Sequence, residues 1–142
     1  MLKHKDQRIG VFVDVQNLYY SARNIYSKKV NFKAILNTAI ADRKLIRAVA
    51  YVIRSQHTEE QTFFDALEKF GFEIKEKDLK VFFGGAKKGD WDVGIAMDMI
   101  RSKNLDVLVL VSGDGDFQPL VEYLKNNGQL VEVLAFGKST AK

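Results

Sequence analysis

The sequence contains no cysteine, one proline and two histidines among its 142 residues. Without cysteine the chain forms no disulfide and offers no thiolate to a metal, so a metal site must be built from oxygen or histidine ligands. The lack of disulfides is typical of the reducing cytosol. We therefore expect a cytoplasmic protein.

Long apolar runs are also absent. No run approaches the roughly 18 residues needed to cross a bilayer, and the start of the chain, Met1 to Arg8, is polar and charged with no signal-peptide core behind it. We expect a soluble protein that is neither exported nor membrane-bound.

The composition indicates an ordinary globular domain, with 46% hydrophobic and 28% charged residues. A chain of this length is the size of one domain, so we expect residues 1–142 to form a single unit. The formal charge of +4 suits a polyanionic partner, although many proteins with this charge bind none.

Short apolar runs rich in β-branched residues predict buried strands. The clearest is Ile9 to Val13, which ends at Asp14. Similar runs lie at 45–53, 107–111 and 131–136, and a shorter fifth candidate lies at 79–83.

Segments with helical periodicity lie between these runs, at about 32–40, 58–70, 90–101 and 117–127. Asn31 is placed to cap the first, Thr58 opens a capping box for the second, and Gly71 and Gly128 follow the second and fourth. Strands that alternate with helices imply right-handed crossovers. The predicted fold class is α/β, a three-layer α/β/α sandwich with a central, mainly parallel sheet of about five strands.

Two aspartates directly follow predicted strands, Asp14 and, after Ser112 and Gly113, Asp114. Sites in open parallel sheets lie beyond the carboxyl ends of the strands, so both are candidates. For Asp14 a turn or helix cap is the alternative. Asn17 could hydrogen-bond that carboxylate or a substrate phosphate, or cap the next helix.

Two further aspartates stand at predicted helix starts. Asp116 lies two residues after Asp114, and such a close pair calls for a cation, a shared proton or hydrogen-bond donors. Asp92 follows the basic segment Lys87-Lys88-Gly89 and falls in the first turn of its helix. For Asp116 and Asp92 the alternative is that each only caps or favours its helix.

Carboxylates without cysteine or a well-placed histidine favour a hard cation, Mg²⁺ or Mn²⁺. Such a site suits hydrolysis of a phosphodiester. Asp98 lies about 120° around its helix from Asp92 and is interpreted as structural. No G-x-G-x-x-G or Walker loop follows the first strand, so dinucleotide binding and NTP hydrolysis lack their phosphate cradle.

Three segments together resemble the NYN domain, the LabA-like branch of the PIN-like nucleases. They are Val13-Asp14-Val15-Gln16-Asn17, Lys88-Gly89-Asp90-Trp91-Asp92-Val93 and Ser112-Gly113-Asp114-Gly115-Asp116-Phe117-Gln118-Pro119-Leu120. The resemblance implies a metal-dependent ribonuclease in which Asp14, Asp92, Asp114 and Asp116 hold the metal. It also implies that Asn17 orients the first carboxylate or the substrate and that Ser112 shapes the loop.

The resemblance further implies a helix after the final strand, which this sequence does not continue into. A truncated carboxyl terminus is therefore expected, and a homodimer is a further expectation.

For substrate contact we expect Lys87 and Lys88, beside Asp92, to bind the phosphates of single-stranded RNA. Trp91 could stack on a base or pack against the sheet. Two alternatives stay open: a catalytically weak module on the same fold that binds RNA or protein, and a metal-dependent phosphatase acting on a small ester.

Overall fold

The structure is a computed structural model that describes residues 4–15, 30–54, 60–78, 80–81, 87–88, 91–113 and 115–135. The larger elements follow one another as β1 (Arg8–Asp14), α2 (Phe32–Ile40), β2 (Lys44–Arg54), α3 (Glu60–Phe70), β3 (Glu73–Asp78), α4 (Asp92–Arg101), β6 (Val107–Val111), α5 (Gln118–Asn126) and β7 (Leu130–Leu134). Three short elements complete the order: β4 (Lys80–Val81), β5 (Lys87–Lys88) and the 3₁₀ helix η1 (Gly115–Phe117).

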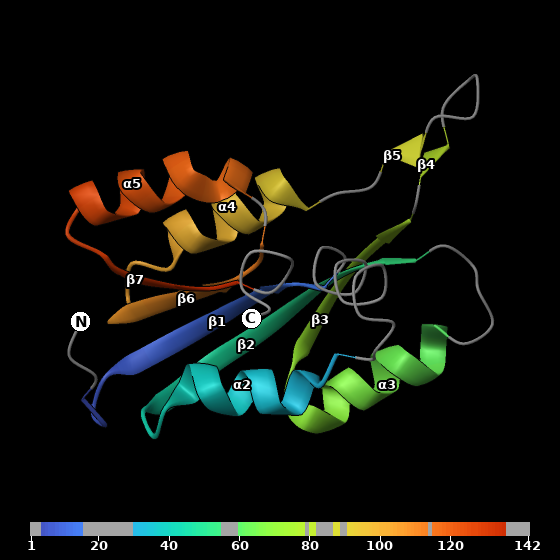
Figure 1. Cartoon of the computed structure of the whole chain (residues 1–142), viewed down its shortest axis with the longest axis horizontal. Coiled ribbons are helices and arrows are strands. Elements are labelled where there is room, and N and C mark those ends of the chain that lie inside the picture. The colour runs from blue at the N-terminus through green and yellow to red at the C-terminus, as the bar shows by residue number, and fades with distance from the viewer. Residues whose placement is uncertain are drawn as a thin grey trace.

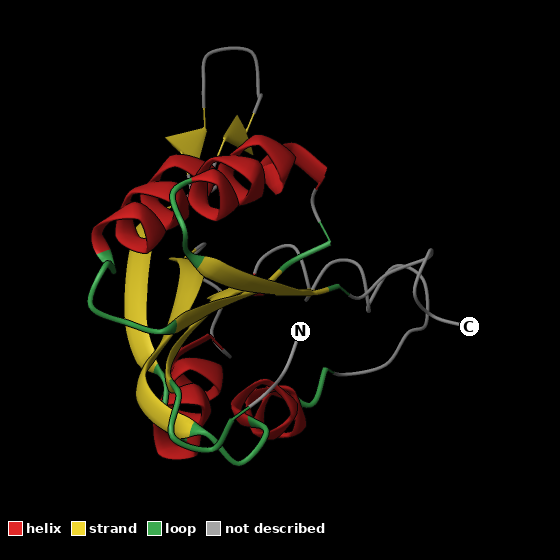
Figure 2. Ribbon diagram, turned by 90° about the vertical axis from the view of Figure 1, so that its left-hand side faces the viewer, coloured by secondary structure: helices red, strands yellow, loops and turns green. Residues whose placement is uncertain are grey.

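Five strands form one sheet in the order β3-β2-β1-β6-β7, and every neighbouring pair in it is parallel. Helices α2 and α3 cover one face and α4 and α5 cover the other (Figures 1 and 2). The predicted three-layer α/β fold is therefore confirmed. The chain starts in the middle, builds outward through β2 and β3, and then crosses over to β6 on the other side of β1. Successive connections thus leave β1 and β6 in opposite directions.

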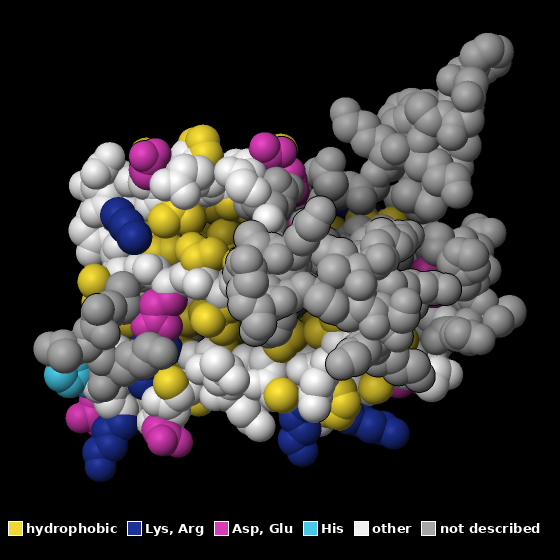
Figure 3. All heavy atoms as spheres, viewed as in Figure 1, with side chains coloured by type: hydrophobic (Ala, Val, Ile, Leu, Met, Phe, Trp, Pro, Cys, Tyr) yellow, Lys and Arg dark blue, Asp and Glu magenta, His cyan; other side chains and the backbone are white. Residues whose placement is uncertain are grey.

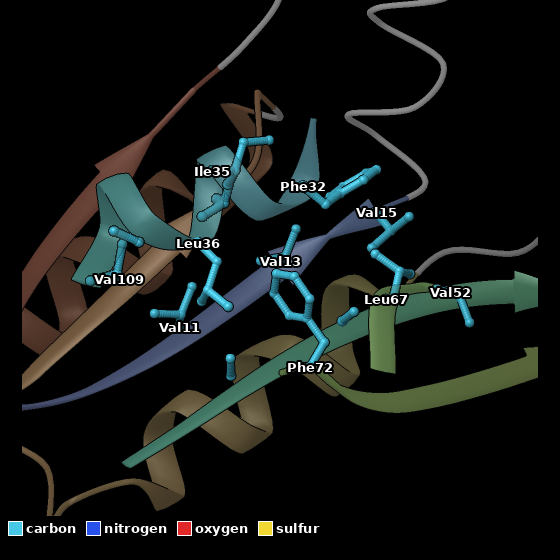
Figure 4. Packing of buried hydrophobic residues seen from close by; sticks show 14 of the residues in the cluster. Val11, Val13, Val15, Phe32, Ile35, Leu36, Val52, Leu67, Phe72 and Val109 are labelled. Atoms are coloured by element: carbon cyan, nitrogen blue, oxygen red, sulfur yellow. The ribbon is translucent and has the colours of Figure 1, made fainter. Parts of the chain in front are cut away.

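Alternate side chains of the central strand supply the two apolar layers. Val11 and Val13 of β1 point into the layer under α2 and α3, where Figure 4 shows them beside Ile35 and Leu36. Phe12 points the other way, into the layer under α4 and α5. Period-two alternation therefore also directs Asp14, two residues beyond Phe12, to the α4 and α5 side.

The predicted helix ends are confirmed where the structure describes them. The Asn31 side chain accepts a hydrogen bond from the Ala34 amide at 3.0 Å. Gly71 and Gly128 follow α3 and α5 with φ of +111° and +83°, the left-handed conformation that glycine adopts without steric cost. The capping box at Thr58 lies outside the described residues.

The fifth strand was predicted at the wrong place. The sheet uses β3, Glu73–Asp78, whereas Lys80 and Val81 from the predicted run 79–83 form β4, a two-residue antiparallel pair with β5. Strand β3 is an edge strand with a single apolar residue, Ile74. A search for apolar runs misses it because an edge strand needs little buried surface and commonly carries charge.

No helix within the described part of the chain is long and apolar enough to cross a membrane. Figure 3 shows apolar side chains between the two helix layers, on the face of the molecule that is turned toward the viewer. Edge strand β7 contributes two apolar side chains that are about half exposed, Leu130 and Val133.

A buried ion pair joins the end of α2 to β7. The Arg43 guanidinium is fully buried and donates to both carboxylate oxygens of Glu132, at 2.7 and 2.8 Å. It also donates to the carbonyl oxygens of Ala39 and Ile40 in the last turn of α2. The cation therefore satisfies carbonyl groups that the helix end leaves without partners.

A variant without Arg43 should therefore unfold more easily than the wild type. We expect Arg43→Leu to lower the free energy of unfolding by about 3–5 kcal/mol, because it leaves the Glu132 carboxylate without its buried counter-ion. Urea denaturation followed by circular dichroism measures this change. The control is Arg47→Leu, which removes the half-exposed pair with Glu73 and should cost only about 0–1 kcal/mol. Equal losses of unfolding free energy in the two variants would contradict the stabilising role of the buried pair.

Candidate active site

Asp14 is a buried carboxylate at the carboxyl end of β1. Its exposed fraction is only 5%. On the neighbouring strand β2, its partner in the parallel register is Tyr51. On the β6 side the Ser112 hydroxyl donates to Asp14 Oδ2 at 3.3 Å, and the Ser112 amide is bonded to the Leu134 carbonyl of β7 at 3.0 Å. The predicted juxtaposition of the ends of β1 and β6 is thus present.

Two helices begin at this edge of the sheet, on the face to which Asp14 points. Helix α4 contacts both β1 and η1. Its first residue is Asp92, which is partly exposed, and Asp116 in η1 is exposed. The amides at a helix start favour negative charge, whether a carboxylate or a phosphate. These helix starts therefore lie at the end of the sheet where the direction of the crossovers reverses.

Trp91, the residue before α4, packs against the sheet. Its indole Nε1–H donates to the Val52 carbonyl at 2.8 Å, and its ring centroid lies 5.3 Å from that of Tyr51. The Lys77 ammonium lies 4.6 Å from the centroid of the same ring. Of the two interpretations of Trp91, base stacking and packing, the structure therefore shows packing.

Asp98 anchors the middle of α4 to β2 and β3. It accepts hydrogen bonds from the Tyr51 hydroxyl at 2.7 Å and from Lys75 Nζ at 2.8 Å. Burial opposes its ionisation, but these hydrogen bonds and the positive charges of Lys75 and Arg47 outweigh burial and lower the pKa of Asp98. Burial and Asp98 raise the pKa of Tyr51, so its hydroxyl remains a donor. This agrees with the structural role predicted for Asp98.

The other predicted site residues are only partly described. Asp114 and Asn17 lie outside the described residues, and Lys87 and Lys88 are described only as the backbone of β5. Within the described ranges, no three Asp, Glu or His side chains are grouped so that they could hold a metal ion. The described part of the site is thus Asp14 with Ser112, and the helix starts that carry Asp92 and Asp116.

Sequence reasoning missed Tyr51. It lies in the middle of an apolar strand, and nothing in the spacing of Tyr51, Lys75 and Asp98 indicates that they meet. Only the register between β2 and β3 and the placement of α4 bring the three together.

Comparison with known proteins identifies what the chain is similar to. The family model of the NYN domain matches residues 8–142. The low amplitude and bright protein LabA of Synechococcus elongatus is 28% identical over 131 residues, which cover 85% of this chain and 69% of that protein. The crystal structure of a protein of unknown function from Vibrio parahaemolyticus superposes with a TM-score of 0.84 at 34% identity, covering 99% of this chain and 90% of the other.

The lowered pKa of Asp98 predicts how its contribution to stability depends on pH. A carboxyl with a lowered pKa in the folded protein stabilises the fold above its ordinary pKa of 3.8, and this stabilisation is lost as the pH falls through the folded value. We expect Asp98→Asn to be less stable than the wild type at pH 7 by roughly 1–3 kcal/mol. The difference should shrink as the pH falls below 3.8.

Urea titrations of both proteins between pH 7 and pH 3 measure that difference. A gap that stays constant over this range would show that the charge of Asp98 does not matter.

Proposed function

This chain belongs to the NYN domain family, a branch of the PIN-like nuclease superfamily, and from that membership we propose that it is a metal-dependent ribonuclease that hydrolyses RNA phosphodiester bonds. The substrate is single-stranded RNA, and the protein acts in the cytoplasm. Four aspartates form the site: Asp14, Asp92, Asp114 and Asp116.

The observation that supports this proposal most directly is the burial of Asp14. Asp14 is only 5% exposed, and burying a carboxylate to this extent has a large desolvation cost. Asp14 nevertheless occupies the end of the central strand, beside Ser112 and on the side where α4 and η1 begin. A buried carboxyl group at the switch point of a parallel sheet is typical of a ligand site.

The chemistry of the donors fits a hard divalent cation. The candidate ligands are carboxylate oxygens, which Mg²⁺ and Mn²⁺ prefer. We propose that Asp14, Asp92, Asp114 and Asp116 hold the ion. When bound, the ion supplies a more acidic water and positive charge beside the scissile phosphate.

Other residues of the chain orient this cluster and the substrate. The Ser112 hydroxyl restrains the Asp14 carboxylate through their hydrogen bond. We assign Asn17 the role of orienting that carboxylate or the substrate. Lys87 and Lys88 in β5 are assigned to the RNA phosphates because their hairpin follows β3, whose carboxyl end lies at the same edge of the sheet as Asp14 (Figure 1).

The test is cleavage of end-labelled single-stranded RNA in Mn²⁺, Mg²⁺ or EDTA. We expect metal-dependent cleavage by the wild type and a loss of roughly 100-fold or more in Asp14→Asn and Asp114→Asn, because removing even an outer-shell partner of a metal ligand typically costs about 10–100-fold. Both variants should stay folded, because removing a negative charge from the cluster relieves repulsion in the metal-free protein. Thermal unfolding without metal checks this point.

The inactive Asp114→Asn protein, purified in parallel, excludes a contaminating nuclease. The control for the substitution itself is Asp42→Asn, in the turn after α2 at the opposite edge of the sheet. It should cleave like the wild type. Full activity in Asp14→Asn would refute the site assignment. RNA binding without cleavage under any metal would instead support the alternative, a binding module on the nuclease fold.

A further inference from the structure

Helix α4 brings a proposed metal ligand, Asp92, to the edge of the sheet, and two contacts fix how this helix lies. Near its start, Trp91 donates to the Val52 carbonyl at 2.8 Å. In its middle, Asp98 accepts from Tyr51 and Lys75. Both contacts lead to β2 and β3, so the helix is attached to the half of the sheet beyond Asp14.

Tyr51 links these two contacts to Asp14. Its ring packs on Trp91, its hydroxyl reaches Asp98, and its backbone is the register partner of Asp14. Tyr51 is completely buried. A closely packed ring in this position transmits small displacements to its neighbours instead of absorbing them.

The start of α4 is also closely packed against the indole. A Cβ atom added at Gly94 would lie 2.5 Å from Cε3 and 2.9 Å from Cζ3 of Trp91. Contacts this short do not occur, so a side chain at this position would displace the ring. The ring and the first turn of α4 therefore have one mutual arrangement, and the first bond of the helix runs from the Ile95 amide to the Trp91 carbonyl at 2.8 Å.

We propose that Trp91 is a positioning residue that holds Asp92 at the correct place relative to Asp14 for metal binding. This inference rests on the function proposed above. The indole N–H sets the position of the residue before Asp92, and the ring, packed between Tyr51 and Gly94, sets its orientation. Partners that orient metal ligands in this way typically change metal affinity by about 10–100-fold when they are removed.

Two variants disturb the indole by different means. Trp91→Phe keeps an aromatic ring but removes the donor to Val52. Gly94→Ala leaves Trp91 intact and displaces its ring, while alanine favours the helix more than glycine does. The matched control is Met97→Ala, which shortens a side chain on the same helix that is 44% exposed.

The first measurement is Mn²⁺ affinity by calorimetry on the full chain without RNA. We expect both Trp91→Phe and Gly94→Ala to weaken Mn²⁺ binding by roughly tenfold or more, and Met97→Ala to bind like the wild type. In cleavage assays the two variants should recover most of the wild-type kcat at saturating Mn²⁺. A role in stability alone would leave the Mn²⁺ affinity of the folded protein unchanged, so the affinity is the measurement that separates the two roles.

The second measurement needs no metal. Amide hydrogen exchange at Ile95 should be faster in Trp91→Phe than in Met97→Ala, because the start of α4 is then held less firmly. Unchanged Mn²⁺ affinity in both indole variants, with Asp92→Asn impaired, would overturn the positioning role and leave the proposed function standing. A wild-type protein that binds no Mn²⁺ would overturn both.

Discussion

The burial of Asp14 constrains the architecture around it. A carboxylate with almost no exposure must be stabilised by donors or positive charge at fixed positions. The fold meets this demand at one place, where β6 brings the Ser112 hydroxyl alongside and where α4 and η1 begin on the same face. The central strand ends at that residue, where its buried apolar run gives way to a carboxyl group.

The position of this site follows from the order of the strands. If every crossover led to the next strand on the same side, each connection would pass over the space between the two strands that it joins. Here the direction reverses between β3 and β6. No connection therefore runs directly from β1 to β6, and the space beyond the carboxyl ends of these two strands stays open. The two-residue β4 and β5 pair lies within the connection that makes this reversal (Figure 1). The crossover that makes this reversal therefore also contains α4, the helix that carries Asp92.

Much of this arrangement is predictable from the sequence because the signals are local. The runs that became β1 and β6 are apolar on both faces, and Asn31, Gly71 and Gly128 act on the backbone within a few residues. The positions of Asp14 at a strand end and Asp92 in a first helical turn follow from the same patterns. A five-strand parallel sheet was expected for these reasons.

The missed features depend on contacts between distant residues. Strand β3 has no apolar run, so its place in the sheet is decided by pairing with β2 and not by its own composition. The contact of Tyr51 with Asp98 spans 47 positions of the chain. The ion pair of Arg43 with Glu132 spans 89. Such pairs appear only when the register of the sheet is known.

The charged side chains of β3 also affect how this strand aligns with β2. Because side chains alternate between faces, a slip of β3 by one residue would exchange its two faces. Lys75 would then leave Asp98 and α4, and Glu76 would leave Arg54 and the α3 side. A strand with one apolar residue cannot set its alignment by hydrophobic burial. Its ionic partners on opposite faces distinguish the correct alignment from the alignment shifted by one residue, and only the correct alignment places Lys75 beside Asp98 of α4.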